Sequence, residues 1–278
     1  MQPIGRPTPA TVRWLTVLGT CLAVSVAAAK VMPSHGGPAL EEAMPIEADS
    51  LAAPPDSVAP PVAEVAPLDT MSLLPFRAKV AGRIGPYRLG YWPAERGAIP
   101  SAAYANPPGF YEVTPQNEDT YVSRHFQLRD FLTHDQGNVW PKYVVLREPL
   151  IEKLENVIAD LEAHGTPVEH VQVMSGFRTP EYNALGVGEG GRVSNSRHQY
   201  GDAADVFVDN DRDGRMDDLN GDGRVDAADD TVIVQAVNRV ERAHPELLGG
   251  AGMYHGTPAH GPFVHIDARG NRARWGNA

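Results

Sequence analysis

The chain has little cysteine and little excess positive charge. Its single cysteine, Cys21, lies in an apolar N-terminal stretch, so removal of that stretch leaves no thiol. Disulfides, cysteine-ligated zinc sites and a cysteine nucleophile are then excluded. The formal net charge of −11 argues against a nucleic-acid partner held by a broad basic surface. The sequence also carries no motif that supports serine hydrolysis.

The N-terminus lacks an apolar run of full membrane-spanning length. Trp14 to Ala29 gives 16 residues, whereas a spanning helix needs about 20. Arg6 and Arg13 precede this run, and alanines 27–29 offer a cleavage site, which together predict an export signal. An uncleaved signal anchor is the alternative. We therefore expect a location in the periplasm or cell envelope, either membrane-anchored or secreted.

Composition divides the rest of the chain. We assign 1–30 to the signal peptide or anchor and 31–72 to a disordered linker, because its proline- and alanine-rich composition cannot form a core. A retained anchor would make this linker a membrane tether. Residues 73–120 are read as an N-terminal extension and 121–278 as the main domain. A monomer is expected.

Hydrophobic patterning predicts an α+β fold in which a small antiparallel sheet is flanked by helices. Helices are expected over 147–164, where leucines and isoleucine recur at helical spacing, and over 229–243, with Asp229 or Asp230 as the cap. The expected strands are 87–91, 109–113, 168–174, 203–208 and 263–267.

A catalytic-type zinc site is predicted from His198, Asp205 and His265. Gly201 permits a turn between the first two, so that a loop histidine and a strand aspartate share a site. His265 lies on the expected strand 263–267. Two histidines and one carboxylate leave a fourth zinc position open, as in catalytic sites.

These residues carry a family resemblance. Ser196, His198, Gly201, Ala203 and Asp205 match the Ser-x-His-x-x-Gly-x-Ala-x-Asp signature of the zinc D-Ala-D-Ala peptidases, a group that includes murein endopeptidases and the hedgehog fold. The segment 175–178, Ser-Gly-Phe-Arg, followed by Asn183, resembles the upstream Ser-Gly-Tyr-Arg motif. The segment 263–267 resembles the strand with the last ligand. The three motifs are in family order and cover about residues 120–275.

The resemblance implies hydrolysis of peptide bonds involving D-amino acids in peptidoglycan, with Arg178 contacting the substrate. One position departs from the family: Pro262 occupies the place of the usual acidic general base. His260 and Asp267 are the substitutes, with His255 as a weaker third candidate. Asp267 is alternatively a partner that orients a zinc ligand.

An acidic insert between the second and third zinc ligands predicts calcium binding. Residues 202–230 contain eleven Asp and three Arg, a balance of −8. Residues 218–229 fit a twelve-residue EF-hand loop of the dockerin type, with glycine at position 6. The expected ligands are Asp218, Asn220, Asp222, the Arg224 carbonyl, Asp226 and Asp229.

The segment just before this loop leaves two alternatives open, a second, weaker calcium ion that shares ligands or no ion, within an acidic insert over 209–229. The ligands of that second ion would be Asp209, Asp211, Asp213 and Asp217. Asn220 would serve both loops, so two complete independent loops cannot coexist. We expect a structural role, in which the ion neutralises the aspartates and fixes the start of the following helix.

Three functions follow from these patterns. The first is a zinc peptidase that cuts peptidoglycan stem peptides or cross-links. The second is a non-catalytic zinc- and calcium-binding module of the cell envelope, which the missing acidic base favours. The third, a dockerin-type interaction module, conflicts with the position of the loop inside the zinc domain. The sequence leaves open whether a peptidase would be a carboxypeptidase or an endopeptidase.

Overall fold

The computed structural model describes residues 64–97, 101–188, 191–257 and 260–276. All of them belong to the unit Ala59–Ala278. The predicted export signal, and the predicted linker up to residue 63, lie outside the described residues. Within the described ranges, no helix is both long enough and apolar enough to cross a membrane.

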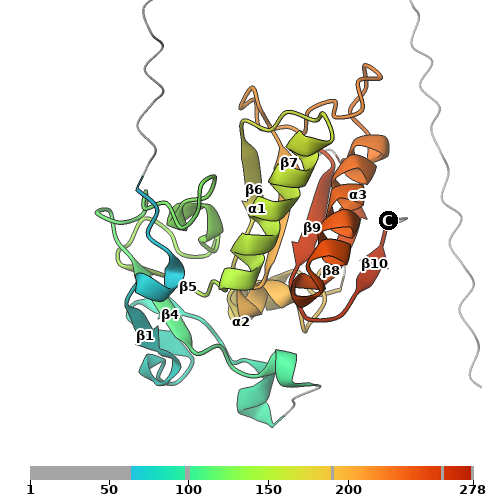
Figure 1. The fold of residues 1–278 in the computed structure, drawn as a ribbon. Coiled ribbons are helices and arrows are strands. Elements are labelled where there is room, and N and C mark those ends of the chain that lie inside the picture. The colour runs from blue at the N-terminus through green and yellow to red at the C-terminus, as the bar shows by residue number, and fades with distance from the viewer. Residues whose placement is uncertain (1–63, 98–100, 189–190, 258–259, 277–278) are drawn as a thin grey trace, which may run out of the picture. The chain divides into compact units, whose positions relative to one another are not determined.

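A five-stranded sheet forms the centre of the fold (Figure 1). The strand order is β10-β8-β9-β7-β6, and every pair is antiparallel except β10 with β8. Two helices, α1 and α3, lie side by side over one face. The elements of this layer are β6 (Val171–Ser175), β7 (Ala203–Val208), β8 (Gly250–Tyr254), β9 (Phe263–Asp267), β10 (Ala273–Trp275), α1 (Glu148–Ala163) and α3 (Ala227–Ala243).

The two long helices bury the apolar faces that their sequences predict. In α1, Leu150, Leu154, Ile158 and Leu161 are buried at helical spacing, and the helix ends before Gly165 as expected. A buried ion pair joins the helices, because Lys153 Nζ of α1 lies 2.6 Å from a Glu241 carboxylate oxygen of α3.

The start of α3 differs from the prediction. Asp226, and neither Asp229 nor Asp230, is the N-cap: its carboxylate accepts a hydrogen bond from the Ala228 N–H at 2.8 Å. Asp229 returns a bond to the Asp226 N–H at 2.8 Å, which completes a capping box. The reciprocal pair extends the helix back to Ala227.

The N-terminal extension is part of the same packed unit. The second sheet, β1-β4-β5, joins β1 (Leu73–Pro75) and β4 (Gly109–Val113) to β5 (Lys142–Val144), so it crosses the predicted boundary at residue 120. The rings of Phe76, Trp92 and Phe110 pack against one another. Leu68 is also buried, so packing begins before residue 73.

The remaining elements are short. The predicted strand 87–91 is only β3 (Tyr87–Arg88), which pairs with β2 (Arg83–Ile84), because the chain turns at Gly90 with a φ of +77°. The predicted strand 168–174 is β6, shifted towards the C-terminus. A short helix, α2 (Pro180–Leu185), begins at Thr179, whose hydroxyl accepts a hydrogen bond from the Tyr182 N–H. The mixed architecture agrees with the α+β prediction.

Gly201 makes the turn that leads into β7. Its φ is +68°, and a Cβ atom there would lie 2.4 Å from the Val145 carbonyl oxygen. The same region is fixed by a hydrogen bond from the Arg147 N–H to the Gly201 carbonyl at 2.9 Å. The turn therefore needs glycine for both its backbone angle and its close approach to Val145.

We predict that Gly201→Ala lowers the free energy of unfolding by about 2–4 kcal/mol, the sum of a left-handed alanine and a steric overlap. Gly165→Ala is the matched control, since its φ is +88° but nothing lies within 4 Å of the added Cβ. That control should cost about 1 kcal/mol. Denaturant titration measures both, and equal losses would refute the packing role of Gly201.

Candidate metal centre

The three predicted zinc ligands converge on one point. Asp205 of β7 and His265 of β9 are direct cross-strand neighbours, and His198 reaches them from the preceding turn. His198 Nε2 lies 3.1 Å from both Asp205 Oδ1 and His265 Nδ1, and the latter two atoms are 2.9 Å apart. All three side chains are buried. Strand alternation explains the placement, because residues 204 and 206 then face away from the site.

The turn that carries His198 is a buried 3₁₀ helix, Arg197–Tyr200. Trp92 of the N-terminal extension donates its indole N–H to the Gln199 carbonyl at 2.8 Å. Arg147 donates to the Tyr200 carbonyl at 3.0 Å. Arg197 forms a buried ion pair with Asp202 across the turn. These contacts fix the backbone on both sides of His198.

The segment 175–178 supplies the support for two ligands. His198 Nδ1 donates to the Gly176 carbonyl at 2.7 Å, which fixes the orientation of the imidazole. Arg178 forms an ion pair with Asp205 through Nη2 and donates through Nε to the Ser175 hydroxyl at 2.8 Å. Gly176 has no room for a side chain, since a Cβ would lie 2.6 Å from Phe131 Cα.

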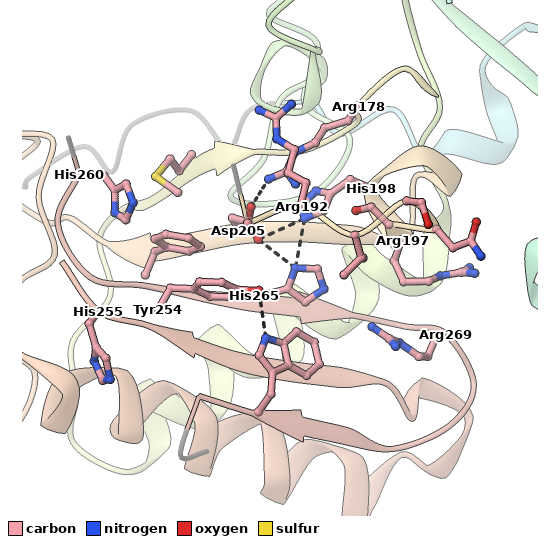
Figure 2. A pocket seen from close by; sticks show the side chains of 18 of the residues that line it. Arg178, Arg192, Arg197, His198, Asp205, Tyr254, His255, His260, His265 and Arg269 are labelled. Atoms are coloured by element: carbon pink, nitrogen blue, oxygen red, sulfur yellow. Dashed lines mark hydrogen bonds and ion pairs between the residues drawn. The ribbon is translucent and has the colours of Figure 1, made fainter. Parts of the chain in front are cut away.

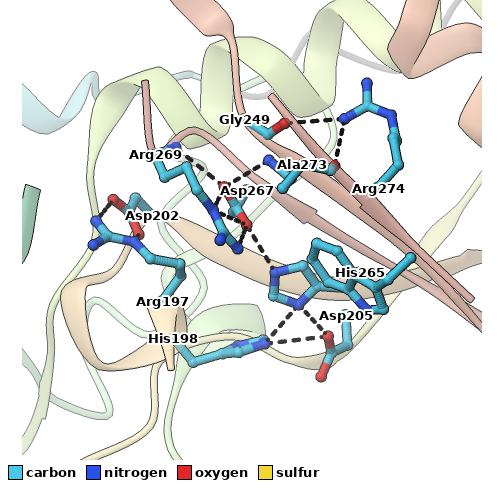
Figure 3. A network of polar contacts seen from close by, with 12 residues as sticks. Arg197, His198, Asp202, Asp205, Gly249, His265, Asp267, Arg269, Ala273 and Arg274 are labelled. Atoms are coloured by element: carbon cyan, nitrogen blue, oxygen red, sulfur yellow. Dashed lines mark hydrogen bonds and ion pairs between the residues drawn. The ribbon is translucent and has the colours of Figure 1, made fainter. Parts of the chain in front are cut away.

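The hydrogen bonds around the ligands orient their lone pairs towards one another (Figure 3). With its proton on Nδ1, His198 presents the Nε2 lone pair, and His265 directs Nε2 at an Asp267 carboxylate oxygen 3.1 Å away. His265 Nδ1 and Asp205 Oδ1 complete the group of acceptors. Tetrahedral zinc with bonds of about 2.0–2.2 Å needs donor atoms roughly 3.3 Å apart. The observed separations of 2.9–3.1 Å are shorter than this, so the three donor atoms would have to move apart slightly to hold such an ion.

The charges around the centre shift its pKa values in opposite directions. Burial lowers the pKa of His198. Burial would raise the pKa of Asp205, but His198, His265 and Arg178 hold it well below its usual range. Burial opposes the charge on His265 as well, yet hydrogen bonds with Asp205 and Asp267 raise its pKa. A metal at this centre therefore competes with a proton on His265.

Asp267 lies behind His265 and is fully buried. It accepts hydrogen bonds from His265 and Arg269, which lower its pKa far below the ordinary value although burial opposes this shift. This is the geometry of a carboxylate that orients a histidine ligand. Of the two roles considered for Asp267 in the sequence, its position favours the orienting role over that of general base. Arg269 was not singled out in the sequence.

The three ligands lie in the wall of a pocket of about 920 Å³ (Figure 2). His260 and His255 both line this pocket, and His260 donates Nδ1–H to the Gly261 carbonyl at 2.8 Å. Arg178 lines it as well. The lining also includes residues that the sequence did not indicate, namely Tyr104, Met174, Arg192, Ser194, Tyr254, Arg269 and Trp275.

The acidic insert forms two successive loops with the same hydrogen bonds. The carboxylates of Asp209, Asp211 and Asp213 come within 4.8 Å of one another. Asp209 accepts bonds from the N–H groups of Asp213 and Gly214. Nine residues on, Asp218 accepts the equivalent bonds from Asp222 and Gly223.

The ends of the two loops are anchored to regular structure. Asp217 donates its N–H to the Val208 carbonyl of β7 at 3.0 Å. Asp226 caps α3, and the buried Asp229 accepts hydrogen bonds from Leu219 and Asn220. Asp222 accepts a bond from the Arg224 N–H at 2.9 Å. The predicted calcium ligands are thus gathered between β7 and α3.

Comparison with known proteins adds no assignment, since no family model and no curated protein matches this chain. The interpretation of the centre therefore depends on its own geometry.

We predict that the protein binds one zinc ion at this centre, and that His198→Ala or His265→Ala abolishes stoichiometric binding. Asp267→Asn should weaken the affinity about 10- to 100-fold, because it removes the acceptor that orients His265. His255→Ala, a pocket residue outside the ligand group, is the control. Zinc content by mass spectrometry and competition with a chromogenic chelator test this. Undiminished binding in His198→Ala would exclude the assignment.

Proposed function

We propose that this protein is a zinc-dependent peptidase that cleaves D-amino-acid-containing peptide bonds of peptidoglycan in the cell envelope. The observation that carries the proposal is the convergence of two histidines and one carboxylate in the wall of an open pocket. Three protein ligands leave a coordination position for a reacting group. The three sequence motifs that resemble those of the zinc D-Ala-D-Ala peptidases support the same activity.

Zinc, when bound, would supply Lewis acidity for the scissile carbonyl and a water molecule of lowered pKa. The chain's own residues do the rest. His198 and His265 are pre-oriented by the Gly176 carbonyl and Asp267, so little reorganisation is needed. Arg178 lines the pocket. Its Nε bonds to Ser175 and its Nη2 to Asp205, so Nη1 takes part in neither of these two contacts.

His260 is the general base in this proposal. It lines the pocket, is partly exposed, and has its Nδ1–H engaged by the Gly261 carbonyl, so Nε2 is the nitrogen that accepts a proton. Asp267 is committed to His265 and Arg269 and lies outside the pocket lining.

Digestion of purified peptidoglycan tests the activity. Zinc-loaded wild-type protein should release products that mass spectrometry of muropeptides identifies as trimmed stems or opened cross-links. His198→Ala should release none. His260→Ala should lose about 10²- to 10⁴-fold in kcat, the usual contribution of a proton-transfer group, whereas His255→Ala should stay close to wild type. Zinc-loaded wild-type protein that releases nothing would refute the peptidase and favour the non-catalytic module.

We also propose that the acidic insert 209–229 binds calcium for structural purposes. Four aspartates crowd the first loop, and burial together with Asp211, Asp209 and Asp213 raises the pKa of Asp217. At the start of α3, the fully buried Asp230 has no hydrogen-bond partner among the described residues. Burial and the charges of Asp229 and Asp226 raise its pKa to about 7. A cation would relieve this repulsion.

We predict that calcium raises the melting temperature and that a calcium-selective chelator lowers it. A ligand at 100 times its Kd stabilises the folded state by about 2.7 kcal/mol. Asp218→Ala should remove most of the calcium response, because its carboxylate organises the second loop. Asp119→Asn, an exposed carboxylate outside the insert, is the control. Melting curves that do not respond to calcium in the wild type would exclude this site.

A further inference from the structure

Arg192 is a cation held rigidly in the wall of the same pocket. Its Nη1 donates to the Tyr182 carbonyl at 2.7 Å, and its guanidinium lies 4.3 Å from the centre of the Tyr182 ring. Its backbone N–H donates to the Gly186 carbonyl at 2.9 Å. The side-chain stem passes over Gly186, where a Cβ would lie 2.4 Å from Arg192 Cδ. These contacts fix the guanidinium before any ligand arrives.

Hydrogen bonds also connect the loop around Arg192 to neighbouring elements. Asn183 of α2, which is buried, donates to the Val193 carbonyl at 2.9 Å. The Gln199 side chain donates to the Ser194 carbonyl at 2.8 Å. The wall of the pocket at this position is therefore connected both to α2 and to the turn that carries His198.

The pocket contains an imbalance of charge at Arg192. The other three arginines of the lining, Arg178, Arg197 and Arg269, each pair with an aspartate of the chain. Arg192 has no carboxylate partner among the described residues. A chain with a net charge of −11 thus places a cation without a carboxylate partner in the wall of the pocket that contains its candidate metal centre.

We propose that Arg192 is a specificity-determining residue that binds a carboxylate of the substrate peptide. The inference rests on the proposed peptidase function of this pocket and deepens it. A guanidinium recognises a carboxylate through two parallel N–H···O bonds, and a fork that is already immobilised loses little entropy on binding. Stacking on Tyr182 and the single bond to its carbonyl leave further N–H donors of Arg192 for the ligand.

Arg178 and Arg192 then have separate tasks. Arg178 is engaged by the metal ligand Asp205 and by Ser175, which keeps it at the reacting centre. Arg192 binds the substrate at another position in the wall of the same pocket. The carboxylate that it binds has two sources in a peptide, the C-terminal α-carboxylate or an acidic side chain next to the scissile bond.

Paired peptides separate these sources. The probes are acetyl-D-Ala-D-Ala as the free acid and as the C-terminal amide, together with an amidated peptide that has glutamate before the scissile bond. Each is measured as a substrate by kcat/KM and, with a reduced scissile bond, as a ligand by calorimetry. The protein is loaded with zinc, and wild type is compared with Arg192→Gln, Arg192→Lys and the control Arg83→Gln, an exposed arginine outside the pocket lining.

We expect wild type to prefer one carboxylate-bearing peptide over the plain amide by roughly 10- to 100-fold, the effect of hydrogen bonds to a charged group. Arg192→Gln should reduce the preference to about twofold or less, Arg192→Lys should retain part of it, and Arg83→Gln should leave it unchanged. Preference for the free acid identifies the C-terminal carboxylate, and preference for the glutamate peptide identifies the side chain.

The inference is overturned if wild type shows no preference for a carboxylate, or if Arg192→Gln keeps the wild-type preference. Its failure is distinct from that of the peptidase proposal. Reduced analogues that bind with an Arg192-dependent preference, without hydrolysis of any peptide, would remove the peptidase and leave the carboxylate site. Hydrolysis without a carboxylate preference would support the peptidase and refute the carboxylate site. Absence of both binding and hydrolysis would refute both proposals.

Discussion

Three buried lone pairs, on His198 Nε2, Asp205 Oδ1 and His265 Nδ1, face one another at separations of 2.9–3.1 Å. Such an arrangement is unfavourable unless a proton or a metal cation lies between the atoms. The surrounding structure is built to maintain it. Trp92, Arg147 and the Gly176 carbonyl hold the His198 turn, and Asp267 holds His265 from behind. The N-terminal extension therefore contributes directly to the geometry of the centre.

The two carboxylates near the centre differ through their partners. Asp205 shares its charge between two histidines and Arg178, and one of its oxygens is directed at the shared point. Asp267 sits on the same strand as His265 but is enclosed by Arg269 and the backbone of Gly250. Enclosure removes it from the solvent that a general base must reach. The same residue type is thus a candidate ligand in one place and an orienting group in the other.

The motifs and their spacing were enough to predict β7, β9 and the three converging residues, because both strands are short, largely apolar segments that each direct one candidate ligand at the site. The central strand β8 was not predicted, since glycine, which fills two of its five positions, is uncommon in strands. The motifs could not decide the role of Asp267, which depends on Arg269 folding back on it. The start of α3 was misplaced because three nearby aspartates are all competent caps, and only the reciprocal bonds of Asp226 and Asp229 select one. Arg192 was missed because its loop has no periodic pattern. The position of its side chain depends on contacts with Tyr182 and Gly186 that only the fold creates.

The acidic insert and the metal centre are linked by covalent and packing contacts. Asp205 lies on β7, which leads directly into the insert after Val208. Helix α3 starts in the insert and carries Glu241. Glu241 holds Lys153, and Lys153 donates to the Asp267 carbonyl at 2.7 Å. A cation that neutralises the insert would stabilise the start of α3, and hence this buried ion pair, without contacting His198, Asp205 or His265. Its effect on the fold therefore exceeds its effect on the centre, because His198 and His265 are oriented by separate bonds, to the Gly176 carbonyl and to Asp267.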